Sequence, residues 1–204
     1  MKILLDPAHG TNIAGKRSVD GRLREYAYSR EICQEVARQL RAEGYDVDFT
    51  TLSESEPGLS KRVATVNAWC DRLGAKNVCV VSIHNNAAGS GAQWLKATGW
   101  EAWTSVGQTR GDKLADCLYD AAEEILKPIF PGIKTLIRTD LADGDRDKEK
   151  NFDIVAKTKC AACLTENFFM DNKADVDWLL SPEGKYAITR LHVLGIKRYV
   201  QKYS

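Results

Sequence analysis

The chain has 204 residues, of which 44% are hydrophobic and 28% charged, and its net charge is +1 at pH 7. This length is typical of a single domain, here spanning residues 1–204 with a sizeable core, and the near-zero charge gives no indication of a nucleic-acid partner. No apolar run reaches the roughly 18 residues of a membrane span, and Asp6 and Pro7 interrupt the N-terminal apolar run before it forms a signal peptide.

The first predicted element is a buried strand over residues 1–5, followed by the sequence Asp6, Pro7, Ala8, His9 and Gly10. Proline cannot donate a hydrogen bond to a sheet, and glycine permits a tight backbone turn. The histidine therefore lies just past the end of an inner strand, where open α/β sheets bind their ligands. A polar loop over residues 11–24 follows, which is a suitable place for a functional site.

An amphipathic helix is predicted to begin at Glu25 and to end near Gly44, because apolar residues recur every four positions between them. The later elements, in chain order, are an edge strand over 46–51, a helix from Ser60 to Gly74, strands over 77–83 and 99–105, a helix over 110–126, a short strand over 134–139, a strand over 160–165 and a helix that starts at Ser181. This alternation predicts an α/β fold whose sheet is covered by helices on both faces.

Three predicted strands end in residues with metal-binding chemistry. Two of the three histidines follow the two most strand-like runs, His9 after residues 1–5 and His84 after residues 77–83, and Glu166 follows the run at 160–165. A hydrolytic zinc site needs three protein ligands and one open position for water, and two histidines with one carboxylate are a standard set. From the residues alone, the carboxylate is either Glu25 or Glu166. Asn85 and Asn86, beside His84, are candidates for contacts with a substrate or with the ligands.

Several other features favour an ordinary structural interpretation. Cys160 and Cys163 form a CxxC pattern inside an apolar strand, so we expect them, like the other four cysteines, to be reduced thiols that pack as small hydrophobic residues. His192 is predicted to be a surface or packing residue of the last helix. The charged stretch 140–151 is predicted to be a solvated loop, since it lacks the glycine spacing and distal glutamate of a calcium loop. Three tryptophans fit either the core or a substrate groove: Trp94, Trp100 and Trp103.

Four motifs resemble the zinc-dependent N-acetylmuramoyl-L-alanine amidases of the amidase-3 family. They are DPAHG around His9, REY around Glu25, SIHNNA around His84 and LTENFFMDN around Glu166, and they occur in the family's order over almost the whole chain. Two positions depart from the usual family pattern, Ala8 in place of a glycine and Thr165 in place of an aliphatic residue, and neither change removes a functional atom.

The resemblance implies a single α/β domain with a mixed, largely parallel twisted sheet. It also implies one Zn²⁺ per chain, held by His9, Glu25 and His84, with Glu166 as the catalytic base. The expected substrate is peptidoglycan, cleaved at the amide bond between N-acetylmuramic acid and L-alanine. We expect a monomer with no nucleic-acid partner.

Two other functional classes stay open. One is a metallopeptidase that acts on the stem peptides of the wall, and the other is a non-catalytic wall-binding homologue. The four intact residues argue against the second class, because a binding module has no need for all of them. The absence of a visible signal peptide predicts a lysin-like protein that stays in the cytoplasm until it is released, or a secreted or periplasmic protein whose signal has been removed.

Overall fold

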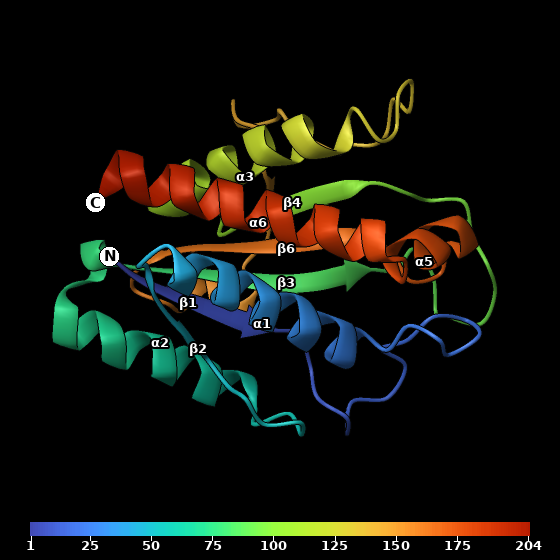
Figure 1. The fold of residues 1–204 in the computed structure, drawn as a ribbon. Coiled ribbons are helices and arrows are strands. Elements are labelled where there is room, and N and C mark those ends of the chain that lie inside the picture. Colours follow the sequence, from blue (N-terminus) through green and yellow to red (C-terminus); the bar gives the residue numbers. More distant parts are fainter.

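The computed structural model describes all residues 1–204 and contains one six-stranded sheet with the strand order β2-β1-β3-β6-β4-β5 (Figure 1). The strands are β1 (Lys2–Pro7), β2 (Asp46–Phe49), β3 (Val78–Asn86), β4 (Trp100–Thr104), β5 (Lys148–Glu149) and β6 (Ala161–Phe169). Neighbouring strands are parallel except for β4 and β6, which are antiparallel. The predicted α/β domain with a mixed, largely parallel sheet is therefore confirmed, and β2 is the expected edge strand.

Helices cover both faces of the sheet. On one face lie α1 (Glu25–Ala42), α3 (Arg110–Leu126) and α6 (Pro182–Tyr203), and Figure 1 shows α6 running across the sheet beside α1. On the other face lie α2 (Leu59–Leu73) and the short α4 (Asp153–Ala156), whereas η1 (Ala75–Asn77) and α5 (Lys173–Leu179) connect larger elements. Both faces of the inner strands are therefore buried, which explains why apolar residues predominate in the first part of each strand.

The two faces of the sheet build two separate cores, and strand alternation decides which residue joins which core. Ile3 and Cys79 belong to a large cluster with the buried residues of α1, α3 and α6, whereas Leu4 and Val80 belong to a smaller cluster with α2 and α4. Cys160 and Cys163 likewise lie in different clusters, and all six cysteines are buried and free. The prediction that the CxxC pattern is structural is confirmed.

The predicted strand over residues 134–139 is wrong. This segment makes a single isolated bridge, between Ile137 and Trp100, with hydrogen bonds from Trp100 N to Leu136 O at 2.7 Å and from Arg138 N to Trp100 O at 2.8 Å. The edge of β4 farther along is occupied by β5, which pairs with Trp103 and Thr104. The segment therefore lies beside β4 only at its start and turns away before a ladder can extend.

His192 and the three tryptophans singled out in the sequence lie inside the protein or against its cores. His192 is fully buried and packs inside the protein, while Trp100 is a core residue and Trp94 and Trp103 pack partly buried against the two cores. The charged stretch 140–151 is exposed at residues 140–144, as expected of a solvated loop, but Asp147 is only 2% exposed and accepts a hydrogen bond from Thr104, and Lys148 and Glu149 form strand β5. No helix has the length and apolar character needed to cross a membrane.

Candidate metal centre and catalytic carboxylate

His9 lies in a strained turn directly after β1. Its φ of 47° falls in the left-handed region, which costs a non-glycine residue about 1–2 kcal/mol. The next residue, Gly10, has to be a glycine, because a Cβ there would lie 2.0 Å from the backbone nitrogen of Glu56. This close approach, together with the hydrogen bond from Thr11 N to Glu54 O at 2.8 Å, turns the chain and places the imidazole at the carboxyl end of the sheet.

His84 and Glu166 are brought side by side by strand pairing. They are direct partners in the parallel register of β3 and β6, and the register shifts immediately afterwards, between His84 and Asn86. Phe168, in β6, has a φ of 60° at this irregularity, as expected for a β-bulge. Paired residues project from the same face of a sheet, so the imidazole and the carboxyl group lie on the face covered by α2 and α4.

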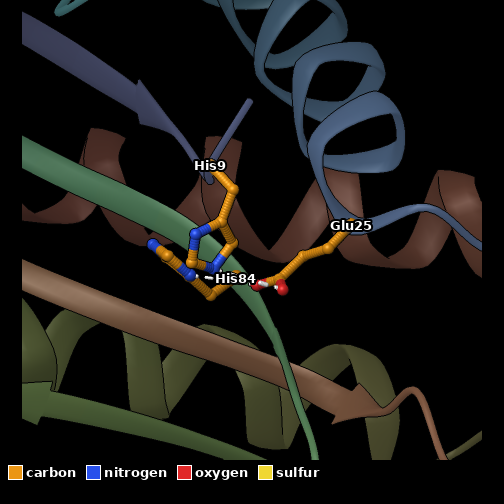
Figure 2. A group of neighbouring side chains, drawn as sticks. All are labelled: His9, Glu25 and His84. Atoms are coloured by element: carbon orange, nitrogen blue, oxygen red, sulfur yellow. Dashed lines mark hydrogen bonds and ion pairs between the residues drawn. The ribbon is translucent and has the colours of Figure 1, made fainter. Parts of the chain in front are cut away.

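Glu25 completes a three-residue cluster. It is the first residue of α1, it is 1% exposed, and Figure 2 shows its side chain pointing between the two imidazoles. Glu25 Oε2 lies 3.3 Å from His9 Nε2, and Glu25 Oε1 lies 3.0 Å from His84 Nδ1. The ligand atoms of the three residues lie within 4.8 Å of one another. Of the two carboxylates left open by the sequence, Glu25 is thus the one in contact with both histidines.

The donor set of this cluster fits a zinc ion. Two ligands about 2.0–2.1 Å from a tetrahedral zinc ion are roughly 3.3 Å apart, which is close to the separations of Glu25 from the two rings. Apart from this contact with His9 Nε2, Glu25 Oε2 is buried without a hydrogen-bond partner, so this oxygen is available as a ligand. The other carboxylate oxygen accepts a hydrogen bond from the backbone N–H of Asn85 at 3.1 Å, which fixes the carboxylate plane.

The electrostatics separate the two glutamates. Burial opposes ionisation of Glu25, but the hydrogen bonds and charges of His84 and His9 prevail and lower its pKa below the usual range. Burial raises the pKa of Glu166 to about 8; His84 opposes this shift, and the negative charges of Glu25 and Glu101 add to it. The Oε2 atom of Glu166 is also buried without a hydrogen-bond partner. The surroundings therefore shift the pKa values of these two carboxyl groups in opposite directions.

Glu166 and the two imidazoles open onto one cleft. A cavity of about 220 Å³ is lined by His9, His84 and Glu166, and Phe152 and Ile154 form part of its wall. The cleft offers a substrate simultaneous access to the two imidazoles and to the carboxyl group of Glu166.

The two asparagines proposed from the sequence have different environments. Asn85 is 3% exposed, and its amide donates to the backbone oxygen of Asn167 at 2.6 Å. Asn86 is half-buried, and its amide donates to Glu101 Oε1 at 2.9 Å. The contact of Asn85 with the site thus runs through its backbone N–H group.

The sequence analysis missed the arginines that hold the His9 turn. Arg62 Nη1 donates to Pro7 O at 2.5 Å, and both Arg62 Nη2 and Arg30 Nη2 donate to the backbone oxygen of His9, at 3.0 and 2.8 Å. The spacing contained a signal for Arg62, because residues 62, 66 and 70 lie on one helix face and residues 66 and 70 are apolar. A buried arginine requires acidic partners, and here these are Asp6 and Glu56.

The chain belongs to the Amidase_3 family, described as N-acetylmuramoyl-L-alanine amidase, whose model matches residues 3–198. It is 29% identical over 201 residues to N-acetylmuramoyl-L-alanine amidase CwlM of Bacillus licheniformis, covering 97% of this chain and 68% of that protein. Its fold resembles that of an N-acetylmuramoyl-L-alanine amidase from Clostridium difficile 630, with a TM-score of 0.78, 21% identity and coverage of 100% of this chain and 98% of that one. It also resembles the catalytic domain of CwlV, an N-acetylmuramoyl-L-alanine amidase from Bacillus (Paenibacillus) polymyxa, with a TM-score of 0.76, 19% identity and coverage of 98% of both chains.

Proposed function

We propose that this protein is a zinc-dependent amidase that hydrolyses the bond between N-acetylmuramic acid and L-alanine in peptidoglycan. The observation that carries the proposal is the convergence of His9, Glu25 and His84, with ligand atoms within 4.8 Å, beside a fourth residue, Glu166, in the same cleft. Membership of the amidase family supports the reaction and the substrate. Residues 1–204 form the catalytic domain in this proposal.

The residues of the chain divide the work of hydrolysis. His9, Glu25 and His84 are assigned as the residues that would hold one zinc ion, and this ion would supply Lewis-acid chemistry, polarising a carbonyl group and lowering the pKa of a water molecule. Glu166 takes a proton from the attacking water and passes it to the leaving amine, a role for which it is placed because its carboxyl group lines the same cleft as His9 and His84. Asn86, half-buried next to His84, is proposed to contact the substrate.

The direct test of this function is digestion of purified peptidoglycan, with the released ends identified by mass spectrometry. We expect free lactyl groups on muramic acid and free amino groups on L-alanine. New ends within the stem peptide would instead identify a metallopeptidase, and no release of either kind would favour a non-catalytic wall-binding protein. The lysin role expected from the sequence is part of this proposal. It predicts that cells lyse once the protein has digested their walls.

The metal assignment is tested separately by elemental analysis of the purified protein. We expect about one zinc ion per chain, and we expect activity to fall to background after treatment with a chelator and to return when zinc is added. A metal-free preparation with full activity would contradict the assignment.

A further inference from the structure

The loop between β1 and α1, residues 11–24, is closed by its own short antiparallel pairing. Arg17 and Arg24 form an antiparallel bridge, flanked by hydrogen bonds from Ser18 N to Leu23 O at 2.8 Å and from Glu25 N to Lys16 O at 3.0 Å. The second of these bonds joins the loop directly to the backbone of Glu25. In Figure 1 this blue loop extends beyond the carboxyl ends of the strands.

The pairing places two positive charges directly opposite each other. The hydrogen bonds flank the pair rather than join it, which is the arrangement in which opposite side chains lie closest, and like charges in such a pair are destabilising. Arg22, in the same loop, is neutralised by Asp20 and Asp177, each at 2.6 Å. By contrast, Arg17 and Arg24 are exposed and form no ion pair with a carboxylate of this chain.

These unneutralised charges surround a cavity that adjoins the catalytic cleft. Arg17, Arg24 and Lys16 line an open cavity of about 270 Å³, and the half-buried Tyr26 forms part of its wall. Lys16 also lines the cleft that contains His9, His84 and Glu166, so it stands at the boundary of the two spaces. The two spaces therefore meet at Lys16, and the charged side chains that line the outer one are all positive.

We propose that this cavity is a subsite for a carboxylate of the stem peptide, on the side of the leaving amine. The proposal rests on the amidase function proposed above. The residue after L-alanine in a stem peptide is a γ-linked D-glutamate, whose α-carboxyl group is either free or converted to an amide. Two residues of extended peptide span at most about 7 Å, so this group lies close to the scissile bond.

The subsite makes the enzyme selective for the free acid. Guanidinium groups bind carboxylates through two parallel charge-assisted hydrogen bonds. An amide cannot accept both of these bonds, because its oxygen is an acceptor and its nitrogen is a donor. A bound carboxylate also relieves the repulsion between Arg17 and Arg24. A hydrogen bond to a charged group contributes enough for a preference on the order of tenfold.

The test compares two tripeptides, L-Ala-γ-D-Glu-L-Lys and the same peptide with the α-carboxyl group converted to an amide. Binding is measured by calorimetry, and KM is measured for the corresponding N-acetylmuramoyl tripeptides. We expect the unaltered protein to bind the acid on the order of tenfold more tightly than the amide and to show a lower KM for it. Equal affinities and equal KM values would overturn the proposal.

Variants assign the preference to the loop. We expect Arg17→Gln to reduce the preference several-fold and the double variant Arg17→Gln, Arg24→Gln to abolish it. Arg22→Gln is the matched control, because Arg22 lies in the same loop but is already paired. A double variant that keeps the preference would overturn the subsite, whereas failure of the unaltered protein to hydrolyse either muramoyl substrate would overturn the amidase proposal instead.

Discussion

Arg62 is a buried residue whose effect on the site is exerted through the backbone of His9. Its guanidinium group pairs with Asp6 at 2.7 Å and with Glu56 at 2.8 Å, and it also donates to the oxygens of Pro7 and His9. These bonds hold the strained turn that aims the imidazole of His9 at Glu25. The side chain is 3% exposed, so the carboxylate of Asp6 would stay buried and lose this partner if Arg62 were removed.

We expect Arg62→Ala to lower the free energy of unfolding by about 3–5 kcal/mol, as is typical when one partner of a buried ion pair is removed. We expect zinc affinity to fall about 10- to 100-fold, because the turn that orients His9 is then no longer held by Arg62. Urea denaturation and competition with a chelator measure the two effects. Arg38→Ala, at an exposed position of α1, is the control and should change neither quantity. Unaltered zinc affinity in Arg62→Ala would contradict the positioning role.

At the scale of elements, the sequence predicted the long strands and helices because their patterns are set by local physics. The runs at residues 1–5, 77–83 and 160–165 are buried on both faces over most of their length, so each is mainly apolar and each is followed by polar residues. Because parallel strands end at one edge of a sheet, the polar residues after these runs could be expected to lie together. This reasoning located His9, His84 and Glu166, whereas the choice of Glu25 as a ligand came from the family resemblance.

Short elements and long-range contacts could not be predicted in this way. β5 has two residues and α4 has four, too few for any periodic pattern, and they form because β4 and β6 provide their partners. Similarly, nothing in the local sequence of β4 shows that Glu101 is bound by Arg138 and Lys148, which are contributed by a later part of the chain. Such contacts depend on tertiary structure and leave no local trace.

The CxxC pattern lies at the start of β6, with Cys160 directly before the strand and Cys163 inside it. Cys160 and Cys163 lie in clusters on opposite sides of the sheet, so their sulfur atoms cannot meet without breaking the strand. We therefore expect six free thiols per chain when thiols are counted under denaturing conditions, with the same number before and after reduction. A reproducible disulfide bond between these two cysteines would contradict the placement of β6.

At the scale of the whole molecule, Asp147 links stability to pH. Burial raises its pKa to about 7, and the neighbouring carboxyl group of Asp145 adds to this shift. Between about pH 4 and pH 7 the folded protein therefore binds a proton at Asp147 that the unfolded chain has released. Stability contributed by this group is present at low pH and is lost as the pH rises through this window.

We expect Asp147→Asn to stabilise the protein at pH 8 relative to the unaltered chain, by on the order of 2–4 kcal/mol, and to have little effect at pH 4. The amide keeps an oxygen that can accept the hydrogen bond from Thr104. Urea denaturation at the two pH values measures the difference. Asp143→Asn, at an exposed position of the same loop, is the control. A stability difference that does not depend on pH would show that Asp147 ionises normally in the folded protein.

The account as a whole depends on a division of roles between two carboxylates in one site. Glu25 contacts both imidazoles and is assigned as a ligand, whereas Glu166 lines the cleft and is assigned to proton transfer. Removing Glu25 leaves two imidazoles, which are too few ligands for a tight zinc site. Removing the carboxyl group of Glu166 leaves the ligand set complete and eliminates a step that contributes about 100- to 10,000-fold in rate.

The most direct test is to measure zinc content and turnover in parallel on Glu25→Ala and Glu166→Gln. We expect Glu25→Ala to lose most of its zinc together with its activity, and Glu166→Gln to keep about one zinc ion per chain while losing nearly all activity. If Glu166→Gln loses the metal while Glu25→Ala retains it, the two roles are reversed and the assignment is contradicted.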